Sequence, residues 1–378
     1  MIEKWNYDKL GDVCDTSAGG TPLKSNKEYY EGGTVPWIRS GEVNNRNICE
    51  SEIKITEAGL KNSSAKLFPP DTVVVAMYGA TAGQVGILDI ECATNQAVCG
   101  ILPNEKFIPE FLYYFFLGFK EKLISQAVGN AQPNISQTKI RNIQIPIPPL
   151  EEQQQIVAIL DDAFAAIEQA QANIEKNIDN AKELFQSKLN EIFSQTGEDW
   201  EEKVWDDVLE IRSGRNQKQV LNSEGKYPIL GSAGKVMGYA DDFICEEYTT
   251  IVGRKGTINN PMLIKEKFWN VDTAFGLHAK DGLNKLYLFY FCRSFDFEKM
   301  DRGSGRPSLV KSDLLKIKMP VPSLENQQKI IKQLETLHDE ITSAQELYKK
   351  KLTNLEDLKQ SLLEQAFAGK LTHKDMPA

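Results

Sequence analysis

The chain has 378 residues, 41% hydrophobic and 26% charged, which is ordinary globular composition and enough length for two to four domains. Its six cysteines form no C-x-x-C pair and its three histidines lie far from them, which argues against a zinc site or disulfide framework and favours the reduced cytoplasm. The formal net charge of -9 argues against a broad basic surface of the kind that binds nucleic acid.

Residues 1–150 are predicted to form a first globular domain of mixed, mostly β structure. The polar start of the chain predicts no signal peptide. The run 72–77 is β-rich, and glycine-bearing turns separate it from its neighbours. The aromatic run 111–119 is too short to span a bilayer, so we expect a core helix there and no membrane association.

Residues 151–193 are predicted to form one long helix that begins after Pro149. At about 1.5 Å per residue its length is roughly 65 Å, which suits a strut better than a core element. A heptad pattern predicts a coiled-coil seam interrupted at Asn177 and Lys188. The seam positions are Ile156, Leu160, Ala163, Ile167, Ala170, Ile174, Asn177, Ala181, Leu184 and Lys188.

A polar stretch near residues 195–198 marks a boundary, after which the same order returns. Residues 198–322 are predicted to form a second mixed domain, with a β-rich run at 248–252 and a core helix over 286–291. A second long helix is predicted over 325–367, after Pro322. Its heptad positions are Ile330, Leu334, Leu337, Ile341, Ala344, Tyr348, Lys351, Leu355, Leu358 and Leu362, with Lys351 interrupting the seam.

The chain is an internal repeat. Residues 146–156 return as 320–330, and this offset of 174 holds through the helices, where Gln186 matches Gln360. The opening segments match at an offset of 195, so that Gly19 corresponds to Gly214. The offset therefore falls by 21 residues across the body of the repeat, which means that the second copy is shorter in its middle. We infer a duplicated scaffold whose central content has diverged.

The negative charge is unevenly distributed. Residues 151–197 carry 3 basic and 9 acidic side chains, whereas residues 1–150 carry 14 and 16, residues 198–322 carry 19 and 19, and residues 323–378 carry 8 and 9. The two globular domains are thus near neutral, which leaves room for a local basic face.

The sequence shows no compelling catalytic constellation. A phosphate loop, an H-E-x-x-H pair and a nucleophile elbow are absent. Residues 259–262 resemble a methyltransferase catalytic loop but lack its second proline and its aromatic residue. Asp207, Glu224 and Lys226 have the loose spacing of a nuclease metal site, but residues 222–226 are typical of a turn. We therefore expect neither a catalytic residue nor a metal site in this chain.

Glycine-bearing loops with polar and basic side chains recur at matched places in both copies. Arg can pair with guanine and Asn or Gln with adenine, while Lys, Ser and Thr suit phosphates, so these loops are candidates for DNA contact. Solvated turns are the alternative for any single loop. The candidates are Lys24, Arg39, Tyr78, Thr81, Gln84, Asn130, Gln132 and Asn134 in the first copy, and Arg212, Arg215, Asn216, Lys218, Arg254, Lys255, Thr257, Arg302, Ser304, Arg306 and Ser308 in the second.

The whole chain resembles the DNA specificity subunit of type I restriction-modification systems. The resemblance rests on two variable domains that each end in P-x-P-x-L-E-x-Q-x-x-I and lead into a heptad helix, on the closing run 363–371, and on residues 35–41, which resemble a motif of target recognition domains. It implies an α+β fold in which two target recognition domains, 1–150 and 198–322, are separated by two long antiparallel coiled-coil helices, 151–197 and 323–378.

The resemblance also implies function and partners. Each domain would read one half of an asymmetric bipartite site in double-stranded DNA, and the helices would fix the spacer between the halves. Two methyltransferase subunits with S-adenosylmethionine would dock on the helices, two restriction subunits that use ATP and Mg could join, and this chain itself would need no cofactor. A coiled-coil adaptor that binds proteins and a stand-alone DNA-modifying enzyme are the alternatives.

Overall fold

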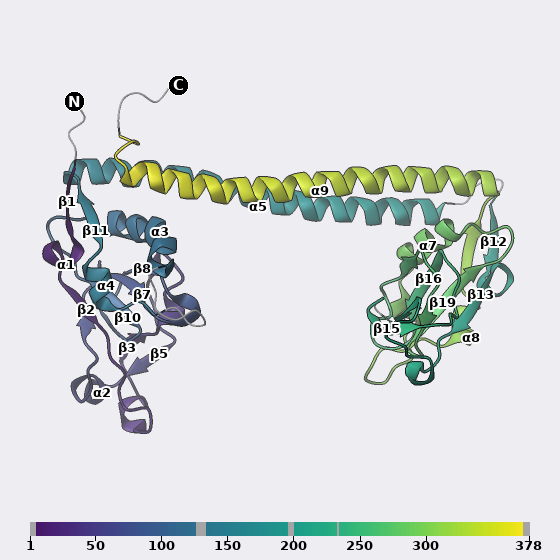
Figure 1. The fold of residues 1–378 in the computed structure, drawn as a ribbon, viewed down its shortest axis with the longest axis horizontal. Coiled ribbons are helices and arrows are strands. Elements are labelled where there is room, and N and C mark those ends of the chain that lie inside the picture. Colours follow the sequence, from purple (N-terminus) through teal and green to yellow (C-terminus); the bar gives the residue numbers. More distant parts are fainter. Residues whose placement is uncertain (1–4, 126–133, 196–199, 233, 373–378) are drawn as a thin grey trace. The chain divides into compact units, whose positions relative to one another are not determined.

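The computed structural model describes residues 5–125, 134–195, 200–232 and 234–372 (Figure 1). The chain forms two compact units, residues 1–173 with 351–378 and residues 174–350. Each unit combines one β-rich domain with part of each of two long helices, α5 (Leu150–Ser194) and α9 (Leu324–Phe367). Among the described residues, no helix has the length and apolar character needed to cross a membrane.

The first domain contains two sheets and a short ribbon. The ribbon pairs β1 (Asn6–Lys9) with β11 (Gln144–Ile147) and so brings the two ends of the domain together. One sheet has the order β2 (Thr16–Ala18), β10 (Val98–Ile101), β7 (Val73–Ala76), β8 (Val85–Leu88) and β4 (Asn47–Ile48). The other has the order β5 (Ile53–Ile55), β3 (Val35–Ile38), β9 (Cys92–Thr94) and β6 (Leu67–Phe68). Its helices are α1 (Leu10–Val13), α2 (Glu57–Lys61), α3 (Pro109–Ser125) and α4 (Gln137–Arg141).

The second domain repeats this plan in fewer residues. Its ribbon pairs β12 (Glu201–Val204) with β20 (Lys318–Val321). One sheet has the order β13 (Leu209–Ser213), β19 (Ala274–Ala279), β16 (Thr249–Gly253) and β17 (Met262–Ile264). The other has the order β15 (Val236–Ala240), β14 (Tyr227–Leu230) and β18 (Trp269–Asn270). The helices are α6 (Trp205–Val208), α7 (Lys285–Ser294) and α8 (Lys311–Leu314). Both domains contain a parallel strand pair at the same place, β3 with β9 and β14 with β18, and the first domain has a second parallel pair, β4 with β8.

The core of each unit is built around one aromatic helix. In the first unit α3 lies against β7 and β8, and its Tyr114 and Phe115 contact Phe164 of α5 and Phe367 of α9. In the second unit α7 takes the same place, packing on β16 and β19 while Phe291 contacts Phe193 of α5. The predicted core helices and buried β-rich runs are therefore confirmed.

A buried glutamine fastens each long helix to its domain. Gln153 is fully buried; its Oε1 accepts a hydrogen bond from the backbone N–H of Ile108 at 3.1 Å, and its Nε2 donates to the carbonyls of Lys106 and Pro148. Gln327, 174 residues later, makes the same three hydrogen bonds, to Asn284, Gly282 and Pro322. These contacts satisfy backbone groups that burial would otherwise leave unpaired.

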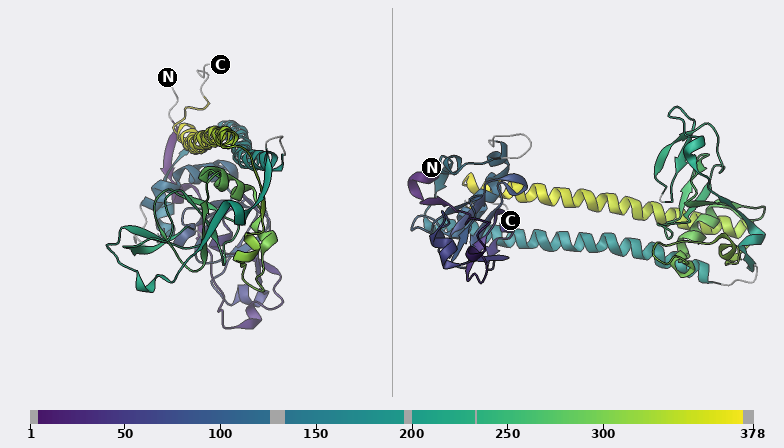
Figure 2. Two further views of the ribbon diagram at one scale, coloured as in Figure 1. Left: turned by 90° about the vertical axis from the view of Figure 1, so that its right-hand side faces the viewer. Right: turned by 90° about the horizontal axis from the view of Figure 1, so that it is seen from below.

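The seam between the long helices follows the predicted heptad only in part. Within each unit α5 and α9 lie side by side and antiparallel (Figure 2). The expected positions hold up to Ile174 in α5 and Tyr348 in α9, and Ala181, Leu355 and Leu362 beyond them also face inward, but the other later positions shift by one residue. Ile178, Phe185 and Leu189 face inward instead of Asn177, Leu184 and Lys188, and Leu352 and Lys359 replace Lys351 and Leu358. The predicted polar interruptions were therefore misplaced.

The shift has a simple geometric cause. From Ile167 to Ile192 the inward residues of α5 follow steps of three, four and four, an eleven-residue repeat that averages about 3.67 residues per turn. This period is close to that of a straight α-helix, whereas a strict heptad requires underwinding. Because the shift falls at matched positions in α5 and α9, it is part of the repeated scaffold.

Candidate nucleic-acid interface

The three predicted loops of the second domain meet in one assembly. The backbone N–H of Gly214 donates to the carbonyl of Ala274 at 3.1 Å, and that of Arg254 donates to Thr273 at 2.8 Å, so both loops rest on the segment 270–274. The third loop joins them because the N–H of Leu309 donates to Arg254 at 2.8 Å.

The first domain contains the same assembly on the segment 94–98. Gly19 donates to the carbonyl of Val98 at 3.1 Å, Met77 donates to Ala97 at 2.7 Å, and Ile135 donates to Met77 at 2.9 Å. These three hydrogen bonds correspond one by one to those of the second domain. The predicted matching of the loops is thus present in the backbone itself.

The matched glycines allow this close packing. A Cβ at Gly19 would lie 2.1 Å from Thr94 Oγ1 and 2.2 Å from its carbonyl oxygen, and one at Gly214 would lie 1.8 Å from the carbonyl oxygen of Val271. The residue after each glycine accepts a hydrogen bond from a tryptophan side chain through its backbone carbonyl. Trp37 Nε1 donates to Gly20 and Trp269 Nε1 donates to Arg215.

The second assembly is basic. Its loops 212–218, 253–257 and 302–308 contain seven Arg or Lys residues and no Asp or Glu. Arg215, Lys218, Lys255, Arg302 and Arg306 are exposed, as are Asn216, Thr257 and Ser304, while Ser308 is half-buried. This is the local basic face that a domain with balanced charge can present.

Loop 302–308 is held in shape by Asp301. Its Oδ1 accepts hydrogen bonds from the backbone N–H groups of Gly303 at 2.7 Å and Ser308 at 2.8 Å. These hydrogen bonds lower the pKa of the Asp301 carboxyl. A bridge between Lys255 and Ser308 and a hydrogen bond from Gly256 to Pro307 join this loop to its neighbour. Arg306 is thereby presented beside Gly256.

Several candidate side chains are already engaged within the domain. Arg212 donates to Glu210 and to the carbonyl of Ile244, and Arg254 lies over the ring of Phe275. Arg302 pairs with Asp313 at 3.3 Å, and Asn216 accepts from the backbone of Lys218. Four exposed cations take no part in the contacts just described: Arg215, Lys218, Lys255 and Arg306.

The first assembly is mostly polar instead of basic. Tyr78 and Asn134 are exposed and form a bridge, and Thr81 donates to the carbonyl of Tyr78 at 3.3 Å. Gln84 is half-buried, and its Oε1 is enclosed without a hydrogen-bond partner. The predicted residues Asn130 and Gln132 lie outside the described part of the chain.

Lys24 and Arg39 lie together beside the first assembly, in a hollow of about 360 Å³ that Tyr30 and Trp37 also line. Arg39 forms ion pairs with Glu42 and Glu52, which offset its charge. Asn95 and Gln96 also line this hollow, although neither was predicted from the sequence. A polar Asn-Gln pair directly after the β-rich run 92–94 was the available signal.

Nothing in the described ranges collects three or more His, Cys, Asp or Glu residues in a geometry that could hold a metal ion. The six cysteines are all free, and burial raises the pKa of Cys92 and Cys245 to about 12, so that these thiols stay protonated.

Comparison with known proteins identifies the family. A model of the type I restriction modification DNA specificity domain matches residues 2–178 and again residues 197–353. The chain belongs to this family. The two matches coincide with the two copies of the repeat, and the family's subject, DNA specificity, agrees with the resemblance noted in the sequence.

Relatives of the type I DNA specificity family extend over the chain to different degrees. The MjaIX specificity subunit of Methanocaldococcus jannaschii is 29% identical over 64% of this chain, and the chain spans only 61% of that subunit. The EcoprrI specificity subunit of Escherichia coli is 23% identical over 88% of both chains. A solved structure that concerns the assembly of a type I R-M system shares the fold, with a TM-score of 0.81, 19% identity, and 98% and 99% of the two chains covered.

Proposed function

We propose that this chain is the DNA specificity subunit of a type I restriction-modification complex. Each loop assembly reads one half of an asymmetric bipartite site in double-stranded DNA. The observation that carries this proposal is the pair of matched assemblies, which share their backbone hydrogen bonds while their exposed side chains differ. Two different half-sites would require different base-contacting side chains, and these two assemblies present such side chains on the same backbone arrangement.

We propose the domain boundaries 1–150 and 198–322 for the two target recognition domains, and 151–197 and 323–378 for the helical spacers. The candidate residues of the two loop assemblies, named by number above, remain the proposed DNA contacts. Arg215 and Arg306 are the strongest among them, because both are exposed on the basic assembly and, unlike Arg302, neither forms an ion pair with another described residue.

We propose partners of the kinds that a type I restriction-modification complex requires. Two methyltransferase subunits with S-adenosylmethionine would carry out adenine methylation, and two restriction subunits using ATP and Mg would carry out cleavage. The chain itself contributes recognition and no catalysis, as befits a family defined by DNA specificity. We place the complex in the cytoplasm, where the six free cysteines would stay reduced.

The test is to co-express the chain with its methyltransferase subunit and to map adenine methylation across the host genome by single-molecule sequencing. We expect a new bipartite, asymmetric methylated motif with a fixed gap. Unchanged methylation despite a stable complex would refute the proposal and favour the coiled-coil adaptor. DNA modification by the purified chain alone would favour the stand-alone enzyme.

A further inference from the structure

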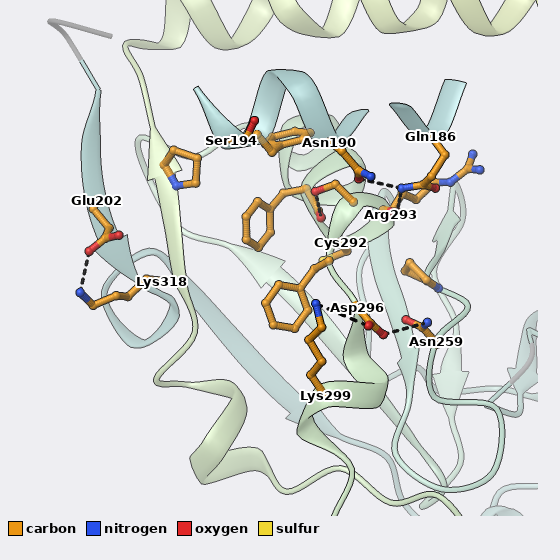
Figure 3. Close-up of a pocket in the computed structure, with 16 residues that line it drawn as sticks. Gln186, Asn190, Ser194, Glu202, Asn259, Cys292, Arg293, Asp296, Lys299 and Lys318 are labelled. Carbon is orange, nitrogen blue, oxygen red and sulfur yellow. Dashed lines mark hydrogen bonds and ion pairs between the residues drawn. The ribbon is translucent and has the colours of Figure 1, made fainter. Parts of the chain in front are cut away.

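Each unit contains a pocket at the same place in the repeat. In the second unit a pocket of about 770 Å³ opens where the end of α5, the helix α7 and the ribbon of β12 and β20 meet (Figure 3). In the first unit a pocket of about 430 Å³ opens where the end of α9, the helix α3 and the ribbon of β1 and β11 meet. The two pockets therefore occupy equivalent positions, one in each copy.

The apolar floor is the same in both pockets. Phe193, Phe291 and Phe295 line the pocket of the second unit, and Phe367, Phe115 and Phe119 line that of the first at matched positions. A proline of the adjoining strand completes each floor, Pro320 in one and Pro146 in the other. Part of this identity serves the core, since Phe115 and Phe291 are buried.

The rim of each pocket carries a glutamine at the same position of the repeat. Gln186 and Gln360 are exposed, yet both line their pockets. Each Nε2 donates to the side chain four residues onward, Gln186 to Asn190 at 3.0 Å and Gln360 to Glu364 at 3.1 Å. Both amides share this contact, and Gln186 Nε2 also donates to the backbone carbonyl of Arg293 at 3.3 Å.

The charged residues around the pockets have diverged. In the second unit Glu202 pairs with Lys318 at 2.6 Å and Asp296 with Lys299 at 3.7 Å, while the first pocket is lined by Glu121, Lys122 and Glu364. An occupant common to both sites therefore cannot be selected by charge. It must be recognised by what is shared, an aromatic and prolyl floor with an amide at its edge.

We propose that each pocket receives an apolar side chain from one copy of the methyltransferase subunit, so that the chain offers two equivalent anchor sites. The occupant must be present twice, since the site is. Pockets of about 430 and 770 Å³ have room for several side chains of a protein segment, of which an apolar one would lie on the aromatic floor. The identity of the partner rests on the function proposed above. The pocket itself rests on the repeat.

The experiment fills each pocket separately. Gln186→Trp and Gln360→Trp place an indole over the floor, and Gln186→Arg and Gln360→Arg place a charge there as a second pair. Glu183→Trp and Asp357→Trp are matched controls, because both residues are exposed on the same helices and neither lines its pocket. The full chain is mixed with the methyltransferase subunit, stoichiometry is measured by native mass spectrometry, affinity by calorimetry, and folding by circular dichroism.

We expect the wild-type chain and the controls to bind two methyltransferase copies. Each single Gln variant should keep its fold, bind one copy normally and bind the other at least about tenfold more weakly, a difference of about 1.4 kcal/mol. The double variant should lose both.

Two results would overturn the proposal. Single variants that bind two copies with wild-type affinity, in a complex that still methylates a bipartite motif, would eliminate the pockets while leaving the function intact. A chain that dimerises alone through residues of the pockets would assign them to a second copy of itself. A wild-type chain that binds no methyltransferase would instead refute the function, and the anchor sites with it.

Discussion

Gln153 and Gln327 show how one buried side chain can fasten a long helix to its domain. Each is fully buried and makes three hydrogen bonds to backbone groups of its own unit. A buried amide is favourable only when it is paired, so the partners matter as much as the glutamine. The repetition of Gln in the P-x-P-x-L-E-x-Q-x-x-I motif thus has a structural reason.

Replacing either glutamine by leucine should destabilise its own unit. Gln153→Leu leaves the N–H of Ile108 and two carbonyls without their partner, and Gln327→Leu does the same at Asn284 and its neighbours. At about 1 kcal/mol or more for each lost hydrogen bond, we expect a loss of about 3 kcal/mol in the free energy of unfolding, measured with urea. Gln154→Leu and Gln328→Leu, at exposed neighbouring positions, should change it by less than about 0.5 kcal/mol. Equal effects at buried and exposed positions would contradict this role.

His278 makes the stability of the second unit depend on pH. Burial, with a smaller contribution from the charge of Arg212, lowers its pKa from 6.5 to about 4, although Glu210 and Glu246 oppose the shift. Its Nδ1 lies 3.4 Å from Thr249 Oγ1, and its Nε2 is enclosed without a hydrogen-bond partner. The folded unit therefore holds a neutral imidazole.

The sign of the pH effect follows from the two pKa values. Between about pH 6.5 and 4 the unfolded chain binds a proton at His278 that the folded chain does not, so stability is complete above pH 6.5 and falls as the pH drops. We expect the Tm of the wild-type chain to fall between pH 7 and 5, and His278→Gln to reduce that slope. A slope that is unchanged in the variant would mean that other groups cause the loss. His338→Gln, at an exposed position, is the matched control.

At the scale of elements, the long helices show where sequence reasoning succeeds and where it stops. The helices begin one or two residues after the prolines that were expected to precede them, and the first half of each heptad is correct. A heptad and an eleven-residue repeat agree over the first turns and part company only as the phase difference accumulates. At the point where the two repeats differ, Leu184 fits the heptad and Phe185 fits the eleven-residue repeat. Because both residues are apolar, the sequence alone does not distinguish the two patterns.

The shifted seam can be tested by truncating those two neighbours. Phe185 is 5% exposed and packs on Tyr290 and His338, whereas Leu184 is 56% exposed. We expect Phe185→Ala to lower the free energy of unfolding by about 3 to 4 kcal/mol and Leu184→Ala to change it by less than about 0.5 kcal/mol. Urea denaturation of both variants measures these changes. A larger loss for Leu184→Ala than for Phe185→Ala would contradict the shifted seam and favour the regular heptad.

The recognition domains were predictable in kind but not in arrangement. The β-rich runs and glycine loops could be read from composition and spacing, because they depend on local preferences. The parallel pairing of β3 with β9, and the placement of segment 94–98 under three loops, depend on contacts between residues far apart in sequence. Arg212 and Arg39 were candidates for DNA contact from their residue type alone, and only the fold reveals their partners Glu210 and Glu42.

At the scale of the whole molecule, the chain combines a scaffold that is repeated with loops that differ between the two copies. The ribbons, the buried glutamines, the seam shift and the pockets recur in both copies, while the loops differ in charge and the second domain is shorter. Features shared by the copies suit partners that bind twice, and features that differ suit an asymmetric DNA site. Recognition should therefore be modular, with each domain responsible for one half-site.

Single substitutions in the second assembly should test that modularity. Arg215 and Arg306 are exposed on loops fixed by Gly214 and Asp301, so Arg215→Ala or Arg306→Ala removes a cation without disturbing the frame. A lost base contact costs about 1 to 3 kcal/mol. In the methylation map of the co-expressed complex, we expect the second half-site to become degenerate or weakly methylated while the first half-site and the gap stay unchanged.

The reciprocal control is Lys24→Ala, at an exposed position beside the first assembly, which should affect only the first half-site. A phosphate contact would weaken binding to all sequences and reduce its salt dependence, whereas a base contact would relax the motif at one position. Measuring affinity at two salt concentrations for each variant separates these roles. An equal loss at both half-sites from a single substitution would show that the domains do not read DNA independently, and the division of labour inferred from the repeat would be wrong.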